Sequence, residues 1–224
     1  MSLISFENVR FCYDDICAVN GANFDVRRGE ILTIVGPNGG GKSTLLKLMA
    51  GIMQPESGVI LRETGVGYVG QNPDFDVSFP ITVRELALMG TLDSKISPIK
   101  RYSVAQKAKA DEALSRVGLA KYAGRSISQL SGGQLKRAVI ARALACDAGV
   151  IAFDEPDASL DADAASQLYE LLSELRKVAS VVIVSHNFRV ALDIADRAIY
   201  VNREIRLYDE PKNLKERLEE GILL

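Results

Sequence analysis

The stretch "GPNGGGKST", residues 36–44, decides how this chain folds. It lies between the run "FDVRRGEILTIVG" (residues 24–36), which is typical of a strand, and the helical pattern "KSTLLKLMAGI" (residues 42–52). Glycine, four residues, glycine, lysine and serine between a strand and a helix form a phosphate-binding pattern. A glycine-rich turn with a surface lysine is the alternative, but it leaves this spacing unexplained. The stretch therefore predicts an α/β fold with a phosphate loop (residues 36–44).

The phosphate loop offers two kinds of phosphate ligand and one ligand for a metal ion. Its glycines let backbone N–H groups turn inward around phosphate oxygens. Lys42 brings a cation to the outer phosphates, and Ser43 offers a hydroxyl to Mg²⁺. The loop residues that we predict to bind a nucleotide are Gly36, Pro37, Asn38, Gly39, Gly40, Gly41, Lys42, Ser43 and Thr44.

A second stretch, "GVIAFDEP" (residues 149–156), is an apolar run of strand length that ends in two carboxylates. In a protein with a phosphate loop, such a strand delivers one carboxylate to the metal and the other to a nearby water. We expect Asp154 to hold Mg²⁺ through water and Glu155 to polarise the attacking water. The alternative is a solvated Asp-Glu pair that caps the next helix.

Composition and charge bound the function. With 224 residues, 47% of them hydrophobic, the chain buries a full core, which excludes disorder as its main state. A net charge of −2 gives no general attraction to nucleic acid or anionic lipid. The N-terminus lacks the pattern of a signal peptide, and the apolar runs are too short to cross a bilayer. We expect the chain to be cytoplasmic.

The three cysteines, Cys12, Cys17 and Cys146, form an odd set with no nearby histidine. This argues against a disulfide framework and against a zinc site. We expect them to be buried, small apolar groups in a reducing compartment.

The chain is predicted to be one domain, 1–224, with a helical insertion. "LISFENVRFCY" (residues 3–13) has the alternation of a strand, and residues 58–71 resemble a short strand pair. From about residue 82 to 130 the pattern turns helical. The runs "GVIAFDE" and "VVIVSH" then indicate a parallel sheet buried on both faces. Residues 1–81 and 131–224 form the predicted α/β core, and residues 82–130 form the helical subdomain.

Two helices of this subdomain have sequence signals of their own. Thr82 and Glu85 stand at capping-box spacing. In the second helix, the apolar residues that we expect near one face are Val104, Ala108, Leu114 and Val117. At the C-terminus, Leu214, Leu218 and Ile222 are four apart, and we expect this helix to pack on its own domain rather than to bind a partner.

The stretch "LSGGQ" (residues 130–134) begins another helix. Ser131 and Gln134 stand at capping-box spacing, so simple capping is one interpretation. That interpretation leaves Gly132 and Gly133 unexplained, because glycine costs about 1 kcal/mol relative to alanine inside a helix. Bare N–H groups at the positive end of a helix instead suit an approaching anion.

With these motifs the whole chain resembles the ATP-binding subunits of ABC transporters, a family with a P-loop NTPase core, a mostly parallel sheet and N-terminal antiparallel strands. "LSGGQ" beside a phosphate loop is highly specific to that superfamily. The resemblance implies ATP and Mg²⁺ as cofactors. It also implies that Tyr13 stacks on adenine, that Gln71 senses the magnesium ion and the attacking water, and that Asp161 crosses between subunits.

The lone histidine, His186, ends the run "VVIVSH". A single histidine at a strand end is more often structural than reactive. The resemblance implies that it contacts the γ-phosphate and orders the water with Glu155. Two positions depart from the family: Asn187 replaces a frequent aspartate, which weakens the support of the histidine, and Gly40 replaces alanine or serine, which loosens the loop.

The resemblance also implies partners. In a head-to-tail dimer, the phosphate loop of one subunit and Ser131, Gly132 and Gly133 of a second copy enclose each ATP. An integral membrane permease carries the substrate, with an extracytoplasmic substrate-binding protein, and the chain lies on the inner face of the membrane through that permease. Nucleic acid is not expected. The family places the permease contact after Gln71, with Phe75, Phe79 and Leu86 as candidates, any of which can instead fill the subdomain core.

The substrate is less well defined by sequence. "FPITVRELALMG" (residues 79–90) resembles subunits for manganese, zinc or iron uptake. "QNPD" (residues 71–74) is similar to the energy-coupling ATPases of cobalt and vitamin uptake, which stay an alternative. A non-transport ABC ATPase is a further alternative, although those proteins carry a coiled-coil insertion or tandem cassettes that this sequence lacks. A small-molecule phosphotransferase has no use for "LSGGQ".

Overall fold

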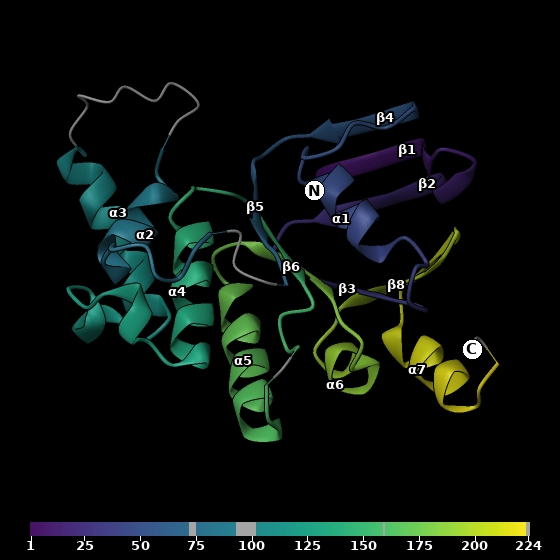
Figure 1. Cartoon of the computed structure of the whole chain (residues 1–224). Helices are drawn as coiled ribbons and strands as arrows, with labels where there is room; N and C mark the ends of the chain where they lie inside the picture. Colours follow the sequence, from purple (N-terminus) through teal and green to yellow (C-terminus); the bar gives the residue numbers. More distant parts are fainter. Residues whose placement is uncertain (72–74, 93–101, 159, 223–224) are drawn as a thin grey trace. The chain divides into compact units, whose positions relative to one another are not determined.

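The computed structural model describes residues 1–71, 75–92, 102–158 and 160–222. The chain forms two compact units, a core unit of Met1–Tyr68 and Gly149–Leu224 and a helical unit of Val69–Ala148 (Figure 1). The helical unit is thus longer than the predicted insertion, because the helix that begins after Ser131 packs with the two helices before it.

The core unit is built on two sheets, as Figure 1 shows. The first has the order β2-β1-β4 and is antiparallel, with β1 (Ser2–Tyr13), β2 (Ile16–Arg27) and β4 (Ser57–Arg62). The second has the order β5-β6-β7-β3-β8-β9, with β3 (Ile31–Val35), β5 (Val66–Val69), β6 (Val150–Asp154), β7 (Ser180–Val184), β8 (Arg197–Asn202) and β9 (Glu204–Tyr208). Strands β6, β7, β3 and β8 run parallel. The predicted fold class is therefore confirmed.

The parallel strands β3, β6 and β7 are buried along their full length, as strands covered on both faces must be. The helices of the core unit are α1 (Lys42–Met49), α5 (Ala162–Leu175), α6 (Phe188–Asp193) and α7 (Pro211–Glu219). The apolar side of α1 packs into a cluster that unites both sheets, and its fully buried members include Leu45, Leu46, Leu48 and Met49. The phosphate loop and the first turn of α1 are thereby fixed to the sheet.

Two details of the strand prediction are wrong. The run at residues 24–36 is not one strand, because Gly29 has a φ of 73° and the chain turns between β2 and β3. Strands β4 and β5 do not pair with each other: β4 pairs with β1, and β5 joins the other sheet beside β6. Pairing partners of short strands are non-local and leave little trace in the strand sequence itself.

The helical unit contains α2 (Val83–Met89), α3 (Val104–Arg116), α4 (Gly132–Leu144) and the short 3₁₀ helices η1 (Ala120–Tyr122) and η2 (Ile127–Gln129). The capping box at Thr82 and Glu85 is confirmed. The predicted face of α3 is only half right, because Val104 is 86% exposed. The side chains that α3 and the residue after it bury are Ala110, Ala113, Leu114 and Val117.

The C-terminal helix α7 packs on its own unit, as predicted. Leu214 and Leu218 are buried against a cluster that includes Leu192 and Tyr200. Ile222 lies beyond the end of α7 and is exposed. No helix among the described residues has the length and hydropathy needed to cross a membrane.

The prediction for the cysteines is wrong. Cys12 and Cys17 are opposite each other in the β1–β2 register and form a disulfide, and the Cys146 thiol is exposed. Antiparallel pairing across a tight hairpin brings these two residues together although five positions separate them. The guanidinium of Arg10 lies 3.4 Å from both sulfurs.

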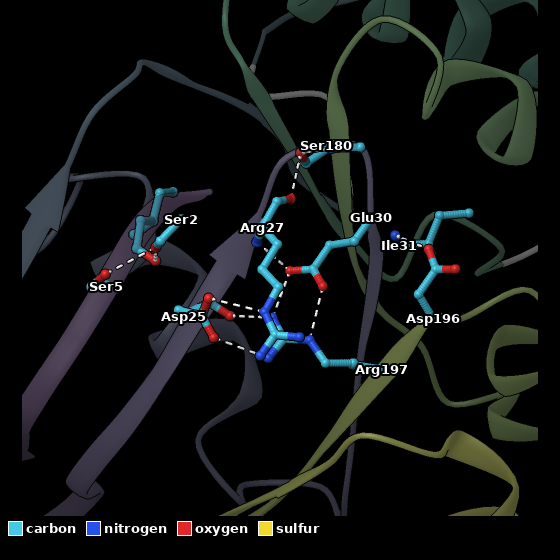
Figure 2. Close-up of polar contacts among 11 residues, drawn as sticks. Ser2, Ser5, Asp25, Arg27, Glu30, Ile31, Ser180, Asp196 and Arg197 are labelled. Atoms are coloured by element: carbon cyan, nitrogen blue, oxygen red, sulfur yellow. Dashed lines mark hydrogen bonds and ion pairs between the residues drawn. The ribbon is translucent and has the colours of Figure 1, made fainter.

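A buried ion-pair cluster joins Asp25 of β2 and Glu30, the residue before β3, to Arg197 of β8, as Figure 2 shows. The guanidinium of Arg197 donates to both carboxylate oxygens of Glu30, at 2.8 and 2.9 Å, and to Oδ1 of Asp25 at 3.0 Å. Burial lowers the pKa of Arg197, but Glu30 and Asp25 together raise it above the ordinary arginine value. Burial likewise acts to raise the pKa of Asp25, but Arg197 brings it below its usual value. Asp25 therefore stabilises the fold at neutral pH, and this contribution is lost as the pH falls through the lowered pKa.

Arg197→Met should lower the free energy of unfolding by about 3–5 kcal/mol, because it leaves the carboxylate of Glu30 buried without its cation. Denaturant titration measures this change. The matched control is Arg206→Met, because Arg206 makes an exposed ion pair with Glu204, and it should cost less than about 1 kcal/mol. Equal losses in the two variants would show that burial of the cluster does not set its contribution.

Candidate nucleotide site

The phosphate loop is held between two backbone carbonyls. A Cβ atom on Gly36 would lie 2.0 Å from the carbonyl oxygen of Val201, and one on Gly41 would lie 2.0 Å from that of Ala18. Gly36 and Gly41 also have φ values of 151° and 104°, in the region that side chains disfavour. The glycines are therefore required by strands β8 and β2 as well as by any ligand.

Gly40 does not loosen the loop, contrary to the prediction. A Cβ there would lie 2.8 Å from the Val201 oxygen and 3.0 Å from the Pro37 oxygen. The Gly40 N–H donates to the Pro37 carbonyl at 3.1 Å, and the Gly40 carbonyl accepts from the Arg203 N–H at 3.2 Å. This glycine allows a closer approach of β8 than alanine would.

Lys42 begins α1 and is almost completely buried. Its Nζ donates to the carbonyls of Gly36 and Pro37, at 3.0 and 2.9 Å, so the ammonium lies inside the curl of the loop. Burial lowers its pKa below the ordinary lysine value, although the carboxylates of Glu155 and Asp154 oppose the shift. Among the described residues, the hydrogen bonds of this buried ammonium go to carbonyl oxygens, and a cation so placed is suited to receive an anion.

Ser43 and Asp154 form the second part of the site. The Ser43 hydroxyl donates to Oδ1 of Asp154 at 2.9 Å, which brings the start of α1 to the end of β6. The hydroxyl of Tyr68 donates to Oδ2 of Asp154 at 3.0 Å. Sequence reasoning missed Tyr68, whose only signal is an aromatic residue shortly before Gln71.

Glu155 and His186 lie together where the neighbouring strands β6 and β7 end. His186 Nε2 is 2.5 Å from Glu155 Oε1. The backbone at Glu155 has a φ of 49°, and its N–H donates to the Val184 carbonyl at 2.9 Å. Non-glycine residues in this region cluster at functional sites, where the surrounding structure holds the strain. The side chain of Glu155 is mostly buried and that of His186 is half exposed.

Tyr13 lies at the end of β1, with half of its surface exposed. Its hydroxyl is 3.4 Å from Thr44 Oγ1 and 3.6 Å from Met53 Sδ. Phe11 packs edge-on against its ring with the centroids 5.0 Å apart. An anchored aromatic ring with an exposed surface near the first turn of α1 can stack on a flat base.

The remaining predicted residues have simpler surroundings. Asn38 and Gly39 are exposed at the tip of the phosphate loop, and Asp161 caps α5 by accepting from the Ala164 N–H at 2.8 Å. In the helical unit, Gln71 follows β5. Asn187 precedes α6 and donates its backbone N–H to Ser185 Oγ at 2.9 Å.

The start of α4 combines both interpretations of "LSGGQ". Ser131 and Gln134 form the capping box, as predicted. A Cβ on Gly132 or Gly133 would meet nothing within 4 Å, so packing within the chain does not require these glycines. The interpretation of these glycines as an anion site stays a prediction.

The donor set suits ATP with Mg²⁺. A glycine loop at a helix start and a buried lysine match a chain of phosphates. A serine hydroxyl and a carboxylate at hydrogen-bond distance are the hard oxygen ligands that Mg²⁺ prefers alongside phosphate oxygens. Among the described residues, no cluster of three or more His, Cys, Asp or Glu side chains could hold a metal without such a ligand.

A phosphate-loop nucleotide hydrolase is defined by a strand, a glycine loop around a buried lysine, and a second strand of the same sheet that leads into an Asp-Glu pair. The ABC transporter family matches residues 19–158, and the chain belongs to that family as one of its ATP-hydrolysing cassettes.

Among curated relatives, the zinc import ATP-binding protein ZnuC of Chelativorans sp. is 38% identical over 88% of this chain and 66% of its own length. The manganese transport system ATP-binding protein MntB of Bacillus subtilis is 37% identical over 86% of this chain and 80% of its own.

Two solved structures show the same fold. An inward-facing ABC transporter described as of the metal-chelate type has a TM-score of 0.85 and is 31% identical, over 95% of this chain and 85% of that one. The dimeric cassette MJ0796 has a TM-score of 0.74 and is 27% identical, over 91% of this chain and 97% of that one.

Gly40→Ala should lower both ATP affinity and the thermal unfolding midpoint, because the added methyl must push β8 or Pro37 away from the loop. The expected loss of stability is about 1–3 kcal/mol. Calorimetric titration with ATP and a thermal melt measure the two effects. The control is Gly65→Ala, where a Cβ meets nothing within 4 Å. A Gly40→Ala variant indistinguishable from this control would contradict the close contact.

Proposed function

We propose that this chain is the ATP-hydrolysing subunit that powers import of a divalent metal cation through a separate membrane permease. The carrying observation is the contact between Glu155 and His186 beside a complete phosphate loop. The cargo assignment is supported by relatives that are named for zinc and manganese transport at 38% and 37% identity.

In this proposal the nucleotide contacts divide by chemistry. The ring of Tyr13 stacks on adenine, the loop N–H groups surround the phosphates, and Lys42 exchanges its carbonyl partners for phosphate oxygens. Ser43 and Asp154 would hold Mg²⁺, which when bound would neutralise phosphate charge, and the family resemblance assigns Gln71 to the same ion. Tyr68 orients Asp154 through its hydrogen bond, leaving Oδ1 directed at Ser43 and the metal position.

Glu155 and His186 prepare the attacking water. Glu155 accepts a proton from that water, and His186 donates a hydrogen bond to the γ-phosphate as negative charge builds on its oxygens. The contact between the two side chains lets the imidazole hold the carboxylate in one rotamer before ATP binds. The positive φ at Glu155 turns its side chain back toward the end of β7.

Two copies of the chain would then complete the site. Gly132 and Gly133 begin a helix whose dipole favours an anion, and none of the residues that the structure describes would lie within 4 Å of a Cβ at either position. A second copy would bring this helix start to the γ-phosphate, with Asp161 crossing between subunits. The dimeric relative MJ0796 supports this arrangement.

A membrane permease and an extracytoplasmic binding protein complete the proposed transporter, with the cassette on the cytoplasmic face. Of the three candidate permease contacts, Leu86 is excluded, because it is fully buried inside the helical unit. Phe79 is 60% exposed, and the ring of Phe75 lies 5.6 Å from the Arg142 guanidinium. Phe79 is therefore the candidate that can be covered by a partner.

The alternative substrate class, cobalt or vitamins, rests on "QNPD". Residues 72–74 of that motif lie outside the described residues. The metal-chelate transporter structure and the zinc and manganese relatives favour the metal class.

Glu155→Gln should leave ATP affinity within a few-fold but lower turnover about a hundredfold or more, because the amide keeps the shape and loses the base. Phosphate release measures turnover, and gel filtration with ATP should show dimers. Glu204→Gln, an exposed carboxamide substitution on β9, is the control. Near-normal hydrolysis by Glu155→Gln would remove Glu155 from the role of base.

The cargo can be tested with the cassette, its permease and its binding protein reconstituted in vesicles. ATP hydrolysis should rise when Mn²⁺, Zn²⁺ or iron is added, and the metal should accumulate on the cassette side of the membrane. Stimulation by a sugar, an amino acid or a vitamin, with no response to any metal, would overturn the metal assignment and leave the ATPase role intact.

A further inference from the structure

A hydrogen-bond network involves residues close in sequence to Glu155 and His186. Ser185, which is 1% exposed, donates its hydroxyl to Asp157, with its Oγ 3.1 Å from Oδ2 and 3.2 Å from Oδ1. The Tyr169 hydroxyl donates to Asp157 Oδ2 at 3.0 Å and lies 2.9 Å from Ser185 Oγ. The network therefore joins the loop after β6, the loop after β7 and helix α5.

The positions of these residues relate the network to the site. Asp157 is two residues after Glu155, and Ser185 immediately precedes His186. The strands behind them are parallel neighbours, with Asp154 opposite Val184. Their two loops therefore leave the same edge of the sheet, and the network is a polar link between them beyond the last backbone pair.

Burial makes this link strong. Tyr169 is 3% exposed, and burial raises the pKa of its phenol well above the ordinary tyrosine value, with Asp157 adding to the shift. The phenol therefore keeps its proton at neutral pH, and a hydroxyl that donates to a carboxylate makes a stronger hydrogen bond than a neutral pair. Ser185 Oγ also accepts a hydrogen bond from the Asn187 N–H. This bond joins the residue before His186 to the residue after it.

We propose that Asp157, Tyr169 and Ser185 are positioning residues that hold the loops of Glu155 and His186 in their catalytic spacing. The proposal rests on the proposed function, because it concerns the pair assigned to water activation. In that role, the network affects the rate of ATP hydrolysis and not the affinity for the nucleotide, since its members bond to one another and to the two loops.

The test uses Tyr169→Phe, which removes one hydroxyl and keeps the ring. Turnover should fall about tenfold while ATP affinity stays within twofold, the pattern of a lost transition-state contribution. Tyr208→Phe is the control, because Tyr208 packs against the cluster beside α7, away from the network. Asp157→Asn is the second variant, since Asp157 is partly exposed and its loss cannot collapse the core. It should show the same split.

A spectroscopic readout separates this proposal from the proposed function. His186 is the only histidine of the chain, so a histidine-labelled sample gives one imidazole signal without assignment. That signal should move or broaden in Tyr169→Phe and Asp157→Asn and stay unchanged in Tyr208→Phe. An unmoved signal, or turnover that falls only with the folded fraction, would overturn the positioning role even if Glu155→Gln behaves as expected. If Glu155→Gln instead retains turnover, the proposed function fails whatever the imidazole signal shows.

Discussion

The close approach of two strand carbonyls to the phosphate loop is the constraint on which the site depends. Val201 of β8 and Ala18 of β2 place their oxygens where Cβ atoms of Gly36, Gly40 and Gly41 would otherwise lie. The conformation of the phosphate loop is thus set by the strands that pack against it, and not by the flexibility of its glycines. Lys42 is buried at this loop, and its ammonium donates to the carbonyls of Gly36 and Pro37 inside the curl.

The strands also determine the geometry of Glu155 and His186. Glu155 comes directly after the last paired residue of β6, and its backbone stays attached to β7 through the Val184 carbonyl. A left-handed residue at this point redirects the chain within one position. The carboxylate consequently reaches the imidazole of His186 although the two residues are 31 positions apart in sequence (186 minus 155). Catalytic distances here follow from strand register, which is a rigid property of a buried parallel sheet.

Sequence reasoning predicted the parts that are local and failed where partners are remote. The structure contains three features that short contiguous segments encode: the phosphate loop, the Asp154–Glu155 pair and the cap at Ser131. Tyr68 could not be found, because its partner Asp154 is 86 positions away and a single tyrosine carries no motif. The buried face of α3 was misjudged for a related reason: alanines and one exposed valine, Val104, share the hydrophobic label although only tertiary packing decides which side they take.

The contact between Val201 and the loop also affects how the chain can vary in evolution. What Gly36 and Gly40 meet at position 201 is a peptide oxygen, which every amino acid possesses. The side chain at that position can therefore change among strand-forming apolar residues without altering the contact, and an alignment column there would show no functional signature. An insertion or deletion in β8 differs, since a shift of one residue moves the oxygen by about 3.3 Å along the strand. What is constrained at position 201 is thus its place in the register of β8, and not which amino acid stands there.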